Sequence, residues 1–209
     1  MQNVLKIDFL QSNLLQSRTR DVIIIEYIEK VCTHAYARTH ARREMNSTAY
    51  AKRTLYKPID FFFRGVADTS GKTKKIAFVD AFQVLNDRYL GRMSVCNYFY
   101  IAEGSVRINE LNIIALEELV NYDLVMKENF LIPDVTYNLP LSTRFLENDK
   151  DFDVLTSAIK DLGYKKSGLI ISFFVSSLTK LDDEGRARYN RLRKLGYKIC
   201  ATAFGEDYN

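Results

Sequence analysis

The sequence predicts an α/β fold in which parallel strands are connected by helices. The clearest evidence is a strand–helix–strand pattern near the end of the chain: an apolar run at 169–175, a helical segment that Gly196 ends, and a second apolar run at 197–203. Short connections between such elements imply that the two strands are parallel in one sheet. Only nine glycines and three prolines interrupt the 209 residues, as is usual in regular α/β proteins.

The helix of this unit follows an acidic stretch, residues 182–184, which suits the positive end of a helix dipole. Ala187, Leu192 and Leu195 are spaced to form an inward face. We therefore expect the four arginines of the segment to point outward.

Earlier in the chain, two apolar runs at 59–67 and 75–82 flank a tight turn and predict an antiparallel hairpin. Helical spacing of apolar residues predicts a helix within 97–122, and residues 133–141 predict another strand. A further helix is expected at 151–162, where Gly163 ends it.

Composition narrows the function classes. With 47% hydrophobic and 27% charged residues the chain is an ordinary globular protein, and a net charge of +4 is too small to indicate nucleic-acid binding. The cysteines Cys32, Cys96 and Cys200 lie far apart, so neither disulfides nor a zinc site is expected. No apolar run reaches about 18 residues, and no signal-peptide core is visible. We expect a cytoplasmic protein, or the cytoplasmic part of a longer one, without a membrane span.

A basic stretch runs from Arg38 to Arg53. It could be an electrostatic patch for nucleic acid or acidic lipid, or a solvated helix and linker. Aromatic residues are scarce in it, which favours the solvated helix.

Five segments in order resemble the EAL domain, a family of bacterial cyclic-di-GMP phosphodiesterases and inactive relatives. Asp80-Ala81-Phe82 stands at the family's Glu-Ala-Leu, and Asn138 at the asparagine of its next strand. Residues 171–178 and 197–205 follow the frame of "LEITESAL" and of "LGxxIALDDFG". The resemblance implies an EAL-like variant of the (β/α)₈ TIM barrel whose first strand is antiparallel to the others. It divides the chain into an N-terminal strand and helix segment, 1–54, and an EAL-like domain, 55–209.

Active members of the family use two divalent metals, which need a cluster of carboxylates. Carried over by position, Asp80 replaces the signature glutamate and Asn138 is kept. Ser172 replaces the glutamate of the fourth strand, and Thr202 and Ala203 replace the aspartate pair of the fifth. The resemblance therefore implies no catalytic residue, no metal site and no cofactor.

The residues left at this site form a weak, vestigial ligand-binding set: Asp80, Asn138 and Arg64. Each has a structural alternative. Asp80 could be a strand-end acid in solvent, Asn138 could merely close a strand, and Arg64 could be a surface or ion-paired arginine instead of a phosphate ligand. We expect any pocket near Asp80, Asn138 and Ser172, at the carboxyl ends of the strands.

The function that the resemblance implies is a catalytically inactive signalling protein, regulatory through cyclic-di-GMP binding or through contacts with a protein partner or a second copy. Two alternatives stay open: a weak or altered metal-dependent phosphodiesterase, and an interaction module without a ligand. Cyclic-di-GMP and a protein are thus the expected partners, and nucleic acid is not.

The five strands of the EAL-like part leave an eight-stranded barrel unfinished. Residues 5–8 read Leu-Lys-Ile-Asp, like the strand that follows in the family, and a helix is expected at 21–31. The N-terminus could therefore supply a sixth strand in a circularly permuted barrel. Alternatively the match is accidental, and the segment is an independent element such as a dimerising arm.

Overall fold

The structure, a computed structural model, describes residues 59–70, 75–87, 91–130 and 135–203. The expected strand at 4–9, the helix at 21–31 and the basic stretch at 38–53 lie outside the described residues. The division of the chain at residue 54 and the permuted sixth strand therefore stay predictions.

The described strands form one mixed sheet in the order β1-β2-β4-β5-β6, with β3 paired to β2 off this path. Pairing is antiparallel for β1–β2 and β2–β3 and parallel for the rest, so the expected hairpin and the parallel C-terminal pair are both confirmed. The strands are β1 Ile59–Asp68, β2 Lys75–Asp87, β3 Gly91–Ser94, β4 Tyr137–Pro140, β5 Leu169–Phe174 and β6 Lys198–Thr202.

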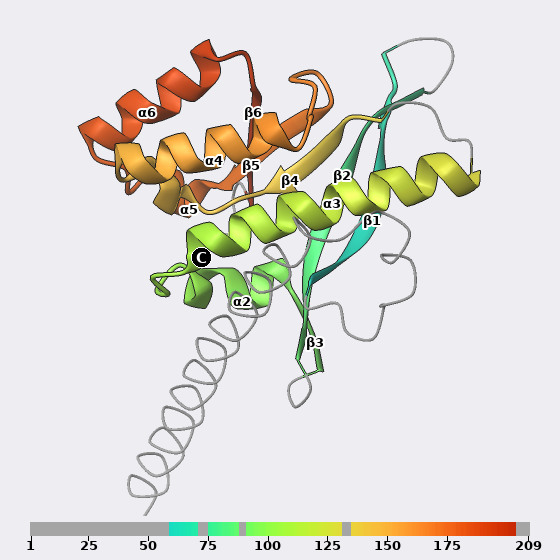
Figure 1. Cartoon of the computed structure of the whole chain (residues 1–209), viewed down its shortest axis with the longest axis horizontal. Coiled ribbons are helices and arrows are strands. Elements are labelled where there is room, and N and C mark those ends of the chain that lie inside the picture. The colour runs from blue at the N-terminus through green and yellow to red at the C-terminus, as the bar shows by residue number, and fades with distance from the viewer. Residues whose placement is uncertain (1–58, 71–74, 88–90, 131–134, 204–209) are drawn as a thin grey trace, which may run out of the picture.

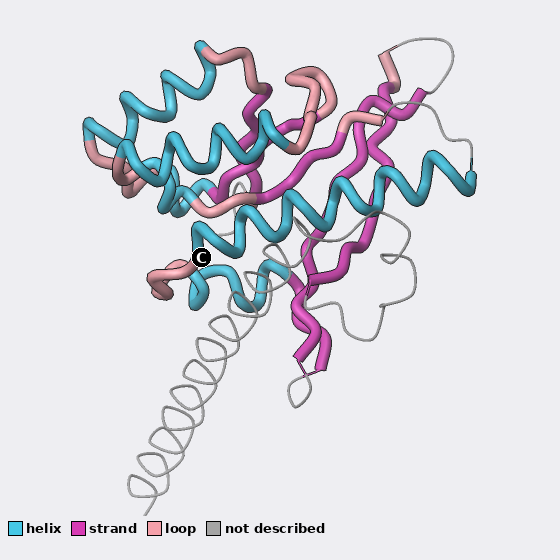
Figure 2. The backbone as a smooth tube through the Cα atoms, in the orientation of Figure 1, coloured by secondary structure: helices cyan, strands magenta, loops and turns pink. Residues whose placement is uncertain are grey.

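The long helices cover one face of this sheet (Figures 1 and 2). The hydroxyl of Tyr137 on β4 donates to Asp123 of α3, and Phe173 on β5 contacts Tyr189 of α6, so these strand residues point toward the helices. The helical elements are α2 Val95–Ala102, α3 Ile108–Phe130, the 3-10 turn η2 Thr143–Leu146, α4 Asp149–Asp161, α5 Val175–Leu178 and α6 Asp183–Lys194.

An aromatic stack holds the centre of the core. Phe145 of η2 lies between Phe152 of α4 and Phe173 of β5, with ring centroids 6.4 and 6.0 Å apart, and all three side chains are fully buried. Burying a phenylalanine contributes roughly 1.5–3 kcal/mol. Capping fixes the helices around it, because Asn148 accepts from the amide of Asp151 and Asp182 from that of Gly185.

The expected inward face of α6 is partly wrong. Leu192 is fully buried, but Ala187 and Leu195 are exposed. Arg188 turns inward instead, with 11% of its side chain exposed. It can do so because its guanidinium donates to the free carbonyls of Leu146 and Glu147 and pairs with two exposed acids, Asp149 and Glu184. The bonds to Asp149 and Glu184 raise the pKa of Arg188, and the bond to Asp149 contributes most.

Other elements differ in extent. β2 continues to Asp87, and β3 returns beside it to form a second hairpin that was not expected (Figure 2). The segment at 97–122 contains parts of two helices, α2 and α3, because the chain turns around Gly104. The strand expected at 133–141 is shorter, and Val175 begins α5 where a strand residue was expected. Among the described helices, none is apolar enough over its length to cross a bilayer.

Candidate ligand site

One row of side chains crosses the sheet on the face opposite the helices. Register pairs Arg64 with Asp80, Asp80 with Asn138, Asn138 with Ile170, and Ile170 with Lys198. Directly paired residues of adjacent strands project from the same face. The three residues expected at the site, Arg64, Asp80 and Asn138, are therefore brought together by neighbouring strands.

The Asp80 carboxylate is bonded at both oxygens. Nη2 and Nε of Arg64 donate to Oδ2 at 2.8 and 3.2 Å, and Nδ2 of Asn138 donates to Oδ1 at 2.8 Å. Only 11% of the Asp80 side chain is exposed, against 68% for Arg64. The arginine thus closes the site from its solvent side and supplies the positive charge that a buried carboxylate requires.

Arg64 has a second contact that fixes its direction. Its guanidinium carbon lies 4.8 Å from the ring centroid of Phe82, within cation–π range. The arginine is therefore held between an aromatic face and a carboxylate, while much of it remains open to solvent.

The remaining positions of the expected site carry little chemistry. Ser172 is fully buried on β5, two residues beyond Ile170, and its Oγ has no hydrogen-bond partner among the described residues. Thr202 ends β6, and Ala203 follows it with a φ of 58°, a left-handed conformation that is uncommon for alanine. Within the described residues, no group of three or more histidine, cysteine or acidic side chains converges.

These residues do not fit a pair of divalent metals. A two-metal site needs several oxygen ligands around ions roughly 4 Å apart. Here Asp80 is the one carboxylate of the row, and both of its oxygens already accept bonds from Arg64 and Asn138. The buried Oδ1 of Asn138 accepts no hydrogen bond within the part of the chain that the structure describes.

Sequence reasoning missed a polar cluster near the carboxyl ends of β4 and β5. The carboxylate of Glu103, just after α2, accepts from Ser142 Oγ at 3.0 Å and from Ser177 Oγ at 3.1 Å. Ser142 follows β4 and Ser177 belongs to α5, directly after β5. The cluster ties α2 to both strand ends, and serines placed soon after two strands were the only signal of it in the sequence.

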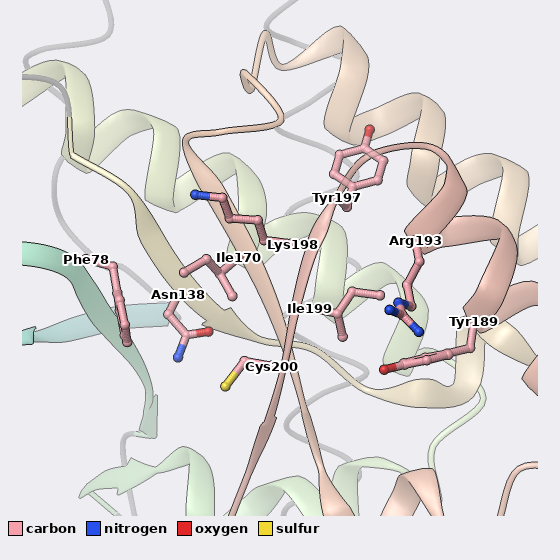
Figure 3. A pocket seen from close by; sticks show the side chains of 9 residues that line it. All are labelled: Phe78, Asn138, Ile170, Tyr189, Arg193, Tyr197, Lys198, Ile199 and Cys200. Carbon is pink, nitrogen blue, oxygen red and sulfur yellow. The ribbon is translucent and has the colours of Figure 1, made fainter.

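A hollow of about 680 Å³ lies around β6. Asn138, Ile170 and Cys200 line it on the face that carries the Asp80 row, whereas Tyr189, Arg193 and Ile199 line it on the helix side (Figure 3). This hollow is not the pocket that the sequence predicted at the carboxyl ends of the strands. Asn138 lines it, but Asp80 and Ser172 do not, and Ile170 and Lys198 lie at the beginnings of β5 and β6. Burial raises the pKa of Tyr197, which also borders the hollow, so its phenol stays neutral.

Several solved structures with a similar arrangement are EAL domains. They include the PaMucR phosphodiesterase in complex with c-di-GMP, with a TM-score of 0.57 and 17% identity over 85% of this chain and 65% of that one. The fold is EAL-like.

Two FimX EAL domains bound to c-di-GMP are similar to this fold to the same degree. The domain from Pseudomonas aeruginosa has a TM-score of 0.56 and 12% identity over 73% of this chain and 59% of its own. The domain from Xanthomonas citri has a TM-score of 0.55 and 9% identity over 88% of this chain and 61% of its own. This chain thus spans less than two thirds of each of these EAL structures. No protein-family profile and no curated protein matches the sequence.

Proposed function

We propose that this chain is a non-hydrolytic EAL-like regulatory protein, which acts by binding and not by cleaving a phosphodiester. The observation that carries the proposal is the closed Asp80 site. Arg64 and Asn138 occupy both oxygens of the carboxylate that stands at the family's signature glutamate. A guanidinium there supplies fixed charge but no Lewis acid and no activated water.

The surrounding positions support the same proposal. Ser172, Thr202 and Ala203 stand where the resemblance places metal-binding acids, and none of them can contribute a carboxylate. Cleavage of a phosphodiester by this family depends on a metal pair to activate water and to offset developing charge. Replacement at these three positions removes most of the carboxylates that the resemblance would assign to the metal pair.

Cyclic-di-GMP is the ligand to test first. The three structural relatives described above are c-di-GMP complexes. Arg64 is the residue of this chain best suited to a phosphate, since it is largely exposed and directed by Phe82. Asn138 Oδ1, in the same row, has no donor among the described residues and suits an N–H donor of a base or of a protein segment.

The decisive experiment combines turnover and binding. Purified full chain is incubated with cyclic-di-GMP and Mg²⁺ or Mn²⁺, and the linear product is quantified beside an Asp80→Ala control. We expect no turnover above that control. Metal-dependent product formation that Asp80→Ala abolishes contradicts the proposal and favours a weak or altered phosphodiesterase.

Titration calorimetry with cyclic-di-GMP then separates the two binding roles. A heat of binding that is smaller for Arg64→Ala than for wild type supports a role as a nucleotide sensor. Absence of heat leaves the non-hydrolytic assignment intact and assigns the regulatory role to protein contacts. Cytoplasmic location and homodimer formation stay predictions from the sequence.

A further inference from the structure

Two arginines lie over neighbouring aromatic rings on the ribbon that β1, β2 and β3 form (Figure 1). The guanidinium carbon of Arg64 is 4.8 Å from the ring centroid of Phe82, and that of Arg92 is 4.6 Å from the ring centroid of Phe62. Phe62 and Phe82 are directly paired across β1 and β2. The side chains of such a pair are close neighbours on one face of a sheet. Both guanidinium groups therefore lie beside a single aromatic pair.

The strand register places this group on the face that carries the Asp80 row. Arg64 is paired with Asp80, and alternate residues of a strand share a face, so Phe82 projects from the same face. Arg92 is paired with Asn86, which lies on that face of β2 as well. The arginines and the rings thus form one surface, which continues the candidate site toward β3.

Both arginines are held in place, yet they keep donors open to solvent. Asp60 Oδ2 accepts from Nη2 of Arg92 at 3.0 Å, as Asp80 does from Arg64. The Arg92 side chain is nevertheless 53% exposed and that of Arg64 68%. Within the described ranges Arg92 donates to this single acceptor, which leaves most of its guanidinium N–H groups for another partner. A forked donor that is already fixed loses little conformational entropy when it binds.

Phe62 supplies an apolar surface beside these donors, because it is 55% exposed. Bases of nucleotides stack on exposed aromatic rings. An arginine beside the base favours guanine, since its fork can donate to both O6 and N7. Adenine has an amino group where guanine has O6, so it cannot accept both bonds. The surface therefore suits a guanine base that carries a phosphate.

We propose that Phe62 and Arg92 bind a guanine base of cyclic-di-GMP. Phe62 stacks on the base, and Arg92 donates to its O6 and N7. Arg64, over the neighbouring ring of Phe82, binds a phosphate of the same ligand. This assignment rests on the cyclic-di-GMP role proposed above, to which it adds the residues that select guanine. Neither Phe62 nor Arg92 is among the residues that the EAL resemblance places at the site.

Calorimetry with cyclic-di-GMP and with cyclic-di-AMP tests the proposal on the full chain. Wild type should bind cyclic-di-GMP at least about tenfold more tightly, because a good bidentate contact discriminates between bases to that extent. Arg92→Gln should bring this ratio to about one or reverse it, since a glutamine amide can accept from N6 and donate to N7 of adenine. Phe62→Ala should weaken the binding of both ligands and leave the ratio unchanged, because stacking is tolerant of the base.

Arg191→Ala is the matched control. Arg191 of α6 also lies over a ring, that of Phe152 at 4.7 Å, bonds an aspartate and is 53% exposed. This variant should bind both ligands like wild type. Arg92→Gln should fold, because Asp60 still accepts from the hydroxyl of Tyr122. Circular dichroism verifies this before the titrations.

Three results overturn the inference while the nucleotide role stands. They are equal affinity of wild type for the two ligands, an unchanged preference in Arg92→Gln, and an unchanged affinity in Phe62→Ala. Absence of cyclic-di-GMP binding by wild type overturns both the inference and the nucleotide role, and the turnover assay then decides the non-hydrolytic assignment alone. A preference that Arg92→Gln loses and Phe62→Ala keeps supports the guanine site, since a merely structural arginine would not alter the choice of base.

Discussion

Arg64 and Lys198 are at opposite ends of the same row of the sheet, yet their surroundings differ. Arg64 donates twice to Asp80 and lies over Phe82. Lys198 has no partner among the described residues, and a hollow opens beside it. The comparison shows that the same row of side chains is electrostatically satisfied at Asp80 and open to a hollow at Lys198.

The difference follows from the neighbours that each strand has. Asp80 has a paired residue on either side, Arg64 on β1 and Asn138 on β4, so both carboxylate oxygens find donors. Lys198 has a neighbour on one side alone among the described strands, and that neighbour is the apolar Ile170. An unpaired charge persists at the edge because solvent can still reach it.

The largest expected effect comes from the strand that joins the two regions. Phe173→Ala on β5 should lower the free energy of unfolding by about 3–5 kcal/mol, because the fully buried ring packs on both Phe145 and Tyr189. Urea denaturation followed by circular dichroism measures the loss. Val154→Ala on α4, which is half exposed, is the control and should stay within about 0.5 kcal/mol of wild type. Equal stabilities for the two variants would mean that β5 is not packed as described.

Substitution of Arg64 or Arg193 should change the free energy of unfolding less than Phe173→Ala does. Arg64→Ala should cost about 1–2 kcal/mol, because the poorly exposed Asp80 carboxylate loses two of its three bonds, although water can partly replace them. Arg193→Ala removes no described bond and should change stability by less than about 0.5 kcal/mol. The same denaturation assay compares the variants. A loss for Arg193→Ala as large as that for Arg64→Ala would remove the distinction between the two regions.

The smallest expected change is a gain in stability instead of a loss. Ser172→Ala removes a buried hydroxyl that has no hydrogen-bond partner in the described ranges, so stability should be unchanged or should rise by up to about 1 kcal/mol. Thermal unfolding with Thr179→Ala as a comparison suits this test, since that exposed hydroxyl donates to the carbonyl of Ser176. A clear loss on substitution of Ser172 would reveal a bonding partner and make the position part of a working polar site.

Much of the fold could be predicted because apolar periodicity and turn residues are local signals. Such patterns predict the β1–β2 hairpin, the parallel strand pair near the C-terminus and the helix α4. The inward face of α6 could not be predicted, since the sequence does not show that the carbonyls at the end of η2 need a donor, which Arg188 supplies. β3 was missed because its four residues are too short to show a period.

The sequence predicted that the three residues of the candidate site lie near one another, but not which bonds they make. Position follows from the EAL resemblance, which places Arg64, Asp80 and Asn138 on adjacent strands. That Arg64 would bond Asp80 depends on the register between β1 and β2, and one residue of slip would have put the arginine on the helix face. The β6 hollow could not be predicted, because the residues that line it come from β2, β4, β5, β6 and α6 and are brought together only by the fold.

The central claim is that Arg64 and Asn138, and not divalent metal, satisfy Asp80. Electron paramagnetic resonance of Mn²⁺ tests it most directly, because the signal of free Mn²⁺ falls when a protein binds the ion. Titration of the full chain into Mn²⁺ with cyclic-di-GMP present should leave the free signal unchanged, for wild type and for Asp80→Ala alike. Uptake of two Mn²⁺ ions per chain that Asp80→Ala abolishes would contradict the account.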